Sequence, residues 1–253
     1  MTPIIKAVGL GKKYRAGNRP TVRPTLREAL TDSVKGLIGR NGRSHFNWAL
    51  RDISFEVRAG EMVGIVGRNG AGKSTLLRIV ARITRPTAGY ADIFGHVSGL
   101  LGVGTGFHPD LTGRENIYLG GAILGMKRVE VARKFDEIVA FSGLEDSLDM
   151  QAKRYSSGMS LRLAFSVAAH LTSDVLLIDE VLSAADADFR QNCLERIKQS
   201  ANNGVAVLFV SHNLETVAQL CQRALHLDAG QLVDDGKPQA VISKYLGTST
   251  VPP

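Results

Sequence analysis

The segment from Gly67 to Ser74 constrains this chain more than any other, because it spells GRNGAGKS and matches the pattern G-x-x-x-x-G-K-[ST]. The mostly apolar residues 61–66 before it predict a strand, and residues 75–82 after it predict a helix. Glycines allow the backbone angles that turn N–H groups toward phosphate oxygens, and a helix start adds partial positive charge. Lys73 in this pattern reaches the β- and γ-phosphates of a nucleotide, and the Ser74 hydroxyl ligates Mg²⁺. The pattern predicts a loop that binds a nucleoside triphosphate.

A second apolar run, VLLI at residues 175–178, is followed by two carboxylates, Asp179 and Glu180. A strand that ends in acids, placed about a hundred residues after such a loop, suits a metal–nucleotide site. We predict that Asp179 holds Mg²⁺, directly or through water. We predict that Glu180 polarises the attacking water as a general base.

The segment YSSGM at residues 155–159 precedes residues 160–171, which are apolar on nearly all sides and predict a buried helix. Small polar residues and a glycine at a helix start either cap the helix or bind an anion. By itself the segment fits an ordinary cap. Its position about twenty residues before Asp179 favours the anion site.

The order of the predicted elements indicates the α/β fold class with a parallel sheet. Strands are predicted at residues 4–8, 49–57, 61–66, 175–178 and 205–210, and a late hairpin at 224–233 with its turn at 228–230. Helices are predicted at residues 75–82, 114–125, 129–142, 160–171, 190–200 and 238–246, and a glycine-rich connection at 99–106.

The whole net charge of +7 lies in one segment, because residues 12–43 hold nine basic and two acidic side chains. Thr25 and Glu28 fit a capping box at the start of an amphipathic helix in this segment. The apolar residues on one face of that predicted helix are Leu26, Leu30, Val34, Leu37 and Ile38. A localised basic segment favours a phosphate-rich or anionic-membrane neighbour, and the alternative is a solvated loop.

Composition excludes several other classes of protein. The 253 residues, 44% of them apolar, predict one domain with a sizeable core. The two cysteines, Cys193 and Cys221, lack metal-ligand spacing and predict buried thiols in a reducing compartment. We expect neither a signal peptide at the start nor a membrane span, so membrane contact is expected to be peripheral.

Together these motifs resemble those of the nucleotide-binding subunit of an ABC transporter, over nearly the whole chain. The GRNGAGKS loop corresponds to Walker A, residues 176–180 to Walker B with its glutamate, and SSGM to an altered signature. Residues 183–186 resemble the D-loop, and His212 the switch histidine. The resemblance implies the P-loop NTPase ABC ATPase fold, with a RecA-like core, an antiparallel β subdomain and an α-helical subdomain. We expect one domain over 1–253, with a basic insertion at 15–47, the helical subdomain at about 107–172, and a C-terminal helix and tail at 235–253.

The resemblance also implies ATP and Mg²⁺ as cofactors and a head-to-tail dimer of two copies, in which each ATP lies between Walker A of one copy and the signature of the other. The implied catalytic residues are Lys73, Glu180 and His212, and the implied metal ligands are Ser74 and Asp179. The implied nucleotide-binding residues are Gly67, Arg68, Asn69, Gly70, Ala71, Gly72, Lys73, Ser74, Thr75 and Tyr14. The residues implied to act on the other copy's nucleotide are Ser156, Ser157, Gly158 and Met159 of the signature. The implied D-loop residues are Ser183 and Asp186. Trp48 is the alternative to Tyr14 for stacking on adenine, and core packing is the alternative for both.

Two features depart from the family pattern. Residues 100–109, where the family has a glutamine that contacts Mg²⁺ and the membrane partner, contain no Gln. The signature lacks the usual Leu, second Gly and Gln, and has Tyr155 and Met159 at its edges. Hydrolysis is still expected because Glu180 and His212 are both present; a non-hydrolysing regulator would lack one of them.

Three segments resemble the branch of this family that exports polymers on polyprenyl-diphosphate lipids. They are the segment GLLGVGTGFHPDLTGRENI, the YSSGM segment and the basic insertion. The implied partners are a polytopic permease and a lipid-linked glycan of O-antigen type, at the cytoplasmic face of the inner membrane. A teichoic acid exporter is the alternative. A soluble ABC protein acting on ribosomes or DNA would carry two ATPase modules or long coiled-coil arms, which this sequence lacks, so no nucleic acid partner is expected. Many O-antigen exporters add a carbohydrate-binding β-sandwich, which residues up to Pro253 do not include.

The basic insertion generates a testable prediction. Changing Arg19, Arg23 and Arg27 together to glutamine removes three of its positive charges, so we expect weaker attraction to the diphosphate headgroup or to the permease. Transport and lipid-stimulated ATP hydrolysis should both fall in vesicles that contain the permease. Unchanged rates of both would contradict a role for this charge.

Overall fold

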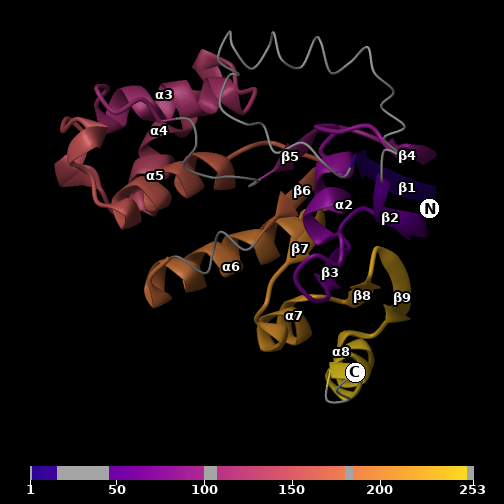
Figure 1. The fold of residues 1–253 in the computed structure, drawn as a ribbon. Helices are drawn as coiled ribbons and strands as arrows, with labels where there is room; N and C mark the ends of the chain where they lie inside the picture. Colours follow the sequence, from indigo (N-terminus) through magenta and orange to yellow (C-terminus); the bar gives the residue numbers. More distant parts are fainter. Residues whose placement is uncertain (1, 16–45, 100–106, 180–184, 250–253) are drawn as a thin grey trace, which may run out of the picture.

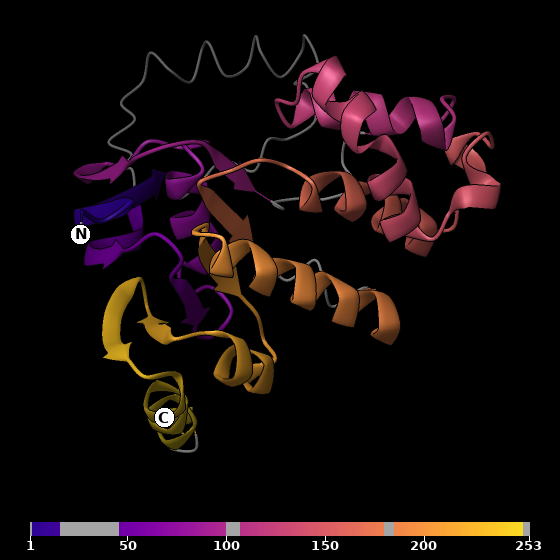
Figure 2. The same ribbon diagram turned by 180° about the vertical axis from the view of Figure 1, so that it is seen from behind.

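The computed structural model describes residues 2–15, 46–99, 107–179 and 185–249 (Figures 1 and 2). In these ranges the N-terminal part forms an antiparallel sheet in the order β2-β1-β4. Its strands are β1 (Ile5–Arg15), β2 (Phe46–Val57) and β4 (Ala88–Ile93). The predicted insertion helix and most of the predicted connection at 99–106 lie outside the described ranges.

A larger sheet has the order β5-β6-β7-β3-β8-β9 within the described chain, and all of its neighbours pair in parallel except β8 and β9. Its strands are β3 (Met62–Val66), β5 (Val97–Gly99), β6 (Val175–Ile178), β7 (Ala206–Val210), β8 (Arg223–Asp228) and β9 (Gln231–Gly236). Every residue of β3, β6 and β7 is buried. Burial on both faces explains why these strands are continuous apolar runs in the sequence.

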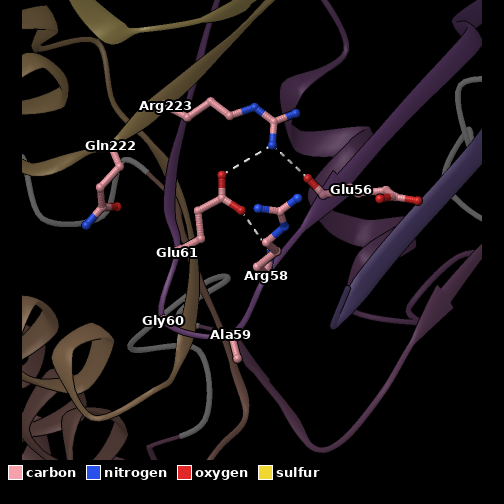
Figure 3. Close-up of a pocket in the computed structure, with 7 residues that line it drawn as sticks. All are labelled: Glu56, Arg58, Ala59, Gly60, Glu61, Gln222 and Arg223. Atoms are coloured by element: carbon pink, nitrogen blue, oxygen red, sulfur yellow. Dashed lines mark hydrogen bonds and ion pairs between the residues drawn. The ribbon is translucent and has the colours of Figure 1, made fainter. Parts of the chain in front are cut away.

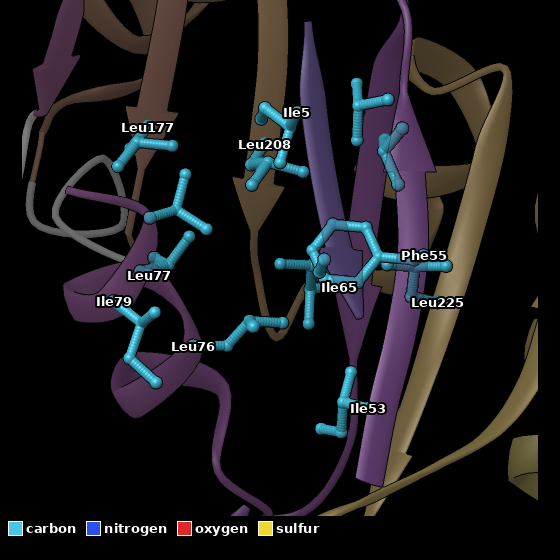
Figure 4. Packing of buried hydrophobic residues seen from close by; sticks show 14 of the residues in the cluster. Ile5, Ile53, Phe55, Ile65, Leu76, Leu77, Ile79, Leu177, Leu208 and Leu225 are labelled. Atoms are coloured by element: carbon cyan, nitrogen blue, oxygen red, sulfur yellow. The ribbon is translucent and has the colours of Figure 1, made fainter. Parts of the chain in front are cut away.

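The helix α2 (Lys73–Val80) lies between the two sheets. Leu76 and Leu77 of this helix are fully buried in one cluster with Ile65 of β3 and Phe55 of β2 (Figure 4). Burying one such leucine stabilises the fold by about 2–3 kcal/mol. This cluster fixes the helix that follows the glycine-rich loop against both sheets.

Three helices cover the other face of the large sheet (Figure 1). They are α6 (Ala187–Asn202), α7 (Leu214–Leu220) and α8 (Pro238–Ser249). Their buried residues, such as Phe189, Val217 and Val241, share a second cluster with the strands β6, β7 and β3.

Residues between β5 and β6 form a helical part with a third hydrophobic cluster of its own. Its elements are α3 (Gly113–Ile123), α4 (Arg128–Ser142), the 3-10 turns η1 (Glu145–Ser147) and η2 (Ala152–Arg154), and α5 (Ser157–Ala169). The helix α5 joins this part to the sheet, because Leu163 and Val167 lie in the third cluster while Phe165 and Ala168 lie in the second. The extent of about 107–172 given to this subdomain stays a prediction.

The structure corrects some of the predicted elements. The first strand was predicted at residues 4–8, but β1 continues to Arg15. Its register with β2 shifts three times between Ala7 and Lys13, so no simple alternation marks its full length. The strands β4 and β5 and the helix α7 were not predicted, because they are short or exposed. The strand at 175–178, the hairpin at 224–233 with its turn at 228–230, and the buried helix after the YSSGM segment are confirmed.

No helix in the described ranges has both the length and the apolar composition that crossing a membrane requires.

A buried histidine at the end of α5 generates a prediction about acid stability. His170 is 5% exposed, and its Nδ1 donates to the Ser166 carbonyl at 2.7 Å. Burial lowers the pKa of His170, so the unfolded chain binds the proton more readily than the folded chain. The stability contributed by the neutral ring is complete above the unfolded pKa of about 6.5, and it is lost as pH falls below that value.

We therefore expect the free energy of unfolding in urea to be lower at pH 5.5 than at pH 7.5, and this difference to shrink in His170→Gln. Some acid dependence should remain in the variant, because burial also lowers the pKa of His226. An identical pH dependence in the variant and the parent would contradict the assignment to His170.

Candidate functional site

The glycine-rich loop connects β3, the central buried strand, to the start of α2. Gly67, Gly70 and Gly72 have φ values of 151°, 82° and 105°. A β-carbon on Gly67 would overlap the carbonyl oxygen of Leu227, and one on Gly72 would lie 2.6 Å from the carbonyl oxygen of Ala49. These two glycines are therefore required both by their backbone angles and by the space around them.

Gly70 differs from its neighbours, because a β-carbon there would have no described atom within 4 Å. The loop thus packs against the protein at both ends and presents its middle to open space. An open middle is what a loop that receives an external group requires.

The side chain of Lys73 spans this loop and is only 6% exposed. Its Nζ donates to the carbonyl oxygens of Gly67 at 2.6 Å and Arg68 at 3.1 Å. These bonds place a positive charge at the loop, next to the first turn of α2.

The start of α2 has no side-chain cap, because its N-cap residue is Gly72, and its first turn has no acidic residue. Four other helices are capped by side chains: Thr112 caps α3, Ser156 caps α5, Asp186 caps α6 and Asn213 caps α7. The helix α4 also lacks a side-chain cap, but it has an acidic residue in its first turn. The first N–H groups of a helix have no partner within the helix. At α2 these groups and the charge of Lys73 fit a polyphosphate, and the Ser74 and Thr75 hydroxyls lie in the same first turn.

Asp179 and His212 follow two neighbouring strands of the large sheet. Asp179 comes directly after β6, and His212 is the second residue after β7. Both strands are parallel to β3, with Ile178 paired to Phe209 and Ile65 paired to Val210. The sheet therefore brings Asp179 and His212 to the same edge as the glycine-rich loop, which is the edge where α/β sheets bind ligands. Glu180 and Ser183 lie outside the described residues.

The predicted signature residues start α5. The Ser156 side chain accepts a hydrogen bond from the Met159 N–H at 3.1 Å, and Ser157 is exposed. The Tyr155 hydroxyl donates to the Ser147 carbonyl at 2.7 Å. The far end of α5 leads to β6, so the helix, about 20 Å long, directs its start away from the sheet (Figure 1). Within one chain the signature is not brought to the glycine-rich loop.

The two candidate aromatic residues differ in their surroundings. The Tyr14 ring is 41% exposed, with the Lys12 Nζ 5.3 Å from its centroid. The Trp48 ring covers Gly11, where a β-carbon would lie 2.8 Å from it, and the Lys13 Nζ lies 4.2 Å from its centroid. Tyr14 is thus the more open of the two, and adenine stacking by either ring stays a prediction.

Sequence patterns did not predict that the β8–β9 hairpin supports the glycine-rich loop. The Gly230 N–H donates to the Ala71 carbonyl at 3.1 Å, and the Gly230 carbonyl accepts from the Arg51 N–H at 2.7 Å. Ala229 and Gly230 both have positive φ, as a two-residue hairpin turn requires. The sequence Asp-Ala-Gly at residues 228–230 indicated a hairpin turn, but it did not indicate that this turn contacts the glycine-rich loop.

A surface pocket of about 710 Å³ lies at the opposite end of β3 from the loop (Figure 3). Glu61 accepts from the Arg58 N–H at 2.9 Å and pairs with Arg223 at 3.2 Å, while Arg223 also donates to the Glu56 carbonyl. These charged groups satisfy one another, which fits a structural role at the junction of the two sheets.

The sheet order and the loop geometry define the class of P-loop nucleotide-binding proteins. Comparison with known proteins narrows this class: the sequence pattern described as "ABC transporter" matches residues 50–183. The chain belongs to the ABC transporter family.

Relatives with related names support this assignment. The chain is 47% identical over 197 residues to the ABC transporter protein AbcA of Aeromonas salmonicida, covering 78% of this chain and 64% of that protein. It is 44% identical to the O-antigen export system ATP-binding protein RfbB of Klebsiella pneumoniae, covering 78% and 80%. It is 36% identical over 241 residues to the teichoic acids export ATP-binding protein TagH of Bacillus anthracis, covering 95% and 42%. The chain thus spans less than two thirds of the length of AbcA and of TagH.

Solved structures share the fold. One titled as the ATP-binding subunit of an ABC transporter has a TM-score of 0.74 at 21% identity, over 98% of this chain and 95% of that one. The cassette MJ0796, in a dimeric structure bound to ADP and Pi, has a TM-score of 0.71 at 20% identity, over 92% and 98%. These similarities confirm the predicted ABC ATPase fold, and the family match confirms the predicted family. The relatives are named as ATP-binding proteins of O-antigen and teichoic acid export.

The contrast between Gly70 and Gly72 gives a matched pair of variants. Gly70→Ala and Gly72→Ala both place an alanine at positive φ, which costs about 1 kcal/mol. Only Gly72→Ala also drives a β-carbon into the Ala49 carbonyl and the Leu50 side chain, at 2.6 Å each. We expect this second variant to lose a further 1–3 kcal/mol, roughly, of stability and to bind ATP at least about tenfold more weakly than Gly70→Ala, a factor that corresponds to about 1.4 kcal/mol.

The measurements are calorimetric titration with Mg²⁺-ATP and thermal unfolding of the ligand-free proteins. Equal affinity and equal stability of the two variants would show that the packing of the loop against β2 is unimportant.

Proposed function

We propose that this chain is the ATP-binding and hydrolysing subunit of an ABC transporter that exports a lipid-linked polysaccharide. The observation that carries the proposal is the uncapped start of α2 beneath an open glycine-rich loop with the buried charge of Lys73. The names of the relatives, which refer to O-antigen and teichoic acid export, support the choice of cargo.

In the proposed site the backbone N–H groups of residues 67–75 and the Lys73 ammonium hold the phosphates of ATP. Ser74 and Asp179 are the proposed ligands of Mg²⁺, and their positions at one edge of the large sheet support this pairing. Mg²⁺, when bound, neutralises charge on the phosphate oxygens and orients them. The segment without the family glutamine, residues 100–109, contributes no side chain to this proposed ligand set.

For hydrolysis we propose Glu180 as the general base, which takes a proton from the attacking water. His212 is proposed to contact the γ-phosphate, and its place after β7, beside the strand that leads to Asp179, supports this. Catalysis of this type depends mainly on positioning and on stabilising charge.

We further propose that two copies pair head to tail, because α5 carries the signature away from the loop of its own chain. The signature of one copy would then complete the nucleotide site of the other copy. The signature residues are Ser156, Ser157, Gly158 and Met159, and the proposed D-loop residues Ser183 and Asp186 of the same copy would lie next to them. The exposure of Ser156 and Ser157 at the start of α5 supports this arrangement.

The proposed cargo is a glycan on a polyprenyl diphosphate, of O-antigen type, with a teichoic acid as the alternative that the relatives also name. A polytopic permease would be the membrane partner and would hold this subunit at the cytoplasmic face of the inner membrane. The basic insertion at residues 15–47 is placed by this proposal near the diphosphate or the permease, because opposite charges attract over short distances at the membrane surface.

The proposal is tested by Glu180→Gln, which keeps the size of the side chain and removes the base. We expect kcat for ATP to fall by about 100–10,000-fold, ATP to remain bound, and a dimer to accumulate with Mg²⁺-ATP. Steady-state hydrolysis and analytical ultracentrifugation measure the two effects.

The matched control is Glu195→Gln on α6, where the Glu195 carboxylate accepts from Gln191 at 3.1 Å on the exposed surface. It should hydrolyse ATP at the parent rate. Hydrolysis at the parent rate by Glu180→Gln itself would refute the assigned base.

A further inference from the structure

The helices α5 and α6 lie side by side through a cluster of aromatic rings. Phe189, in the first turn of α6, is 1% exposed. Its ring meets Phe165 of α5 edge-on, with centroids 5.9 Å apart, and Phe141 of α4 at 5.6 Å. Edge-to-face pairs at such distances are favourable. The start of α6 is thus packed against α5, which begins in the YSSGM segment, and against α4.

Arg162 covers this cluster from α5, five residues after Ser157. Its guanidinium carbon lies 5.1 Å from the Phe189 ring centroid, and its Nε lies 3.9 Å from Oδ2 of Asp186. The same side chain passes Gly143, the C-cap of α4, where a β-carbon would lie 3.5 Å from the Arg162 Nη2. One arginine on the signature helix therefore contacts the start of α6 and lies beside the end of α4.

Asp186 uses its two carboxylate oxygens differently. Oδ1 accepts a hydrogen bond from the Phe189 N–H at 2.9 Å and so caps α6. Oδ2 faces Arg162, whose Nε is buried and has no hydrogen-bond partner among the described residues. A buried donor without a partner favours the approach of the nearest carboxylate. The cap of α6 and the signature helix are linked through this one residue.

We propose that Arg162 is a positioning residue that holds Asp186 and the first turn of α6 in a fixed place relative to the signature residues 156–159. The two segments then face the nucleotide of a second copy as a single surface. This inference rests on the proposed head-to-tail dimer, and it goes beyond it by naming the contact that keeps the two halves of that surface together.

The chemistry of arginine suits this role better than that of lysine. The planar guanidinium can lie on the Phe189 ring and face the Asp186 carboxylate at the same time, whereas a lysine ammonium is a compact charge that can do only the second well. Arg162→Lys is therefore expected to keep part of the effect, and Arg162→Met, which keeps a long stem without charge, to lose most of it.

The experiment measures the ATP concentration that gives half-maximal dimer, by ultracentrifugation, in proteins that also carry Glu180→Gln. We expect Arg162→Met to raise this concentration about five- to tenfold, the loss of one ion pair and one cation–π contact, and Arg162→Lys to raise it less. Affinity for ADP, measured on the monomer, should stay within about twofold of the parent, because the phosphate loop lies in another part of the chain. A general loss of structure would weaken ADP binding as well.

Arg114→Met is the matched control. Arg114 makes the same kinds of contact, with its Nε 3.1 Å from Asp149 and its guanidinium carbon 5.2 Å from the Phe135 ring, and both of these partners lie in the helical part. It should dimerise at the parent ATP concentration.

Asp186→Asn gives a second test that does not depend on the folding of the arginine variant, because asparagine also caps helices well. It should raise the required ATP concentration. Arg162→Met should add less to it in the combined variant than it adds alone, because only the contact with the Phe189 ring is then left to lose. Full additivity of the two changes, or dimerisation of Arg162→Met at the parent concentration, would overturn the inference and leave the proposed function standing. Failure of the Glu180→Gln parent itself to dimerise would overturn the dimer and this inference with it.

Discussion

The packing of α2 between two sheets is the constraint on which the rest of this structure depends. The buried leucines of α2 share a cluster with β3 of the large sheet and with β1 and β2 of the antiparallel sheet. The start of the helix is therefore fixed relative to both sheets. The loop before it is closed at its two ends by neighbouring backbone, at Leu227 beside Gly67 and at Ala49 beside Gly72. Only its middle, around Gly70, is open. A phosphate site made of backbone N–H groups needs this rigidity, because such groups bind well only when they are already aligned.

The helical part is attached to the large sheet through α5. This part has a hydrophobic cluster of its own, and α5 also contributes residues to the cluster that packs on the large sheet. The signature therefore sits on a helix that is anchored at one end and exposed at the other. In the proposed dimer, the exposed end of this helix would meet the glycine-rich loop of the other copy.

Much of the fold could be predicted from the sequence because the relevant signals are local. The strand at 175–178 is a continuous apolar run, as full burial requires, and the helix after YSSGM is apolar on nearly all sides because it packs against two clusters. The misses have physical reasons as well. The long strand β1 is interrupted by register shifts, β4 is largely exposed, and β5 has three residues, so their patterns are weak.

Within the candidate site the division is similar. The GRNGAGKS motif by itself determined the loop, the charge of Lys73 and the hydroxyl of Ser74, because these residues act through their neighbours in sequence. Only the tertiary structure decided that β6 and β7 lie beside β3, which brings Asp179 and His212 to the edge of that loop. It also decided that Gly230 supports Ala71 and that Arg162 faces Asp186. Such pairs join residues far apart in the chain, and the directions of side chains and hairpins are set by packing rather than by any local pattern.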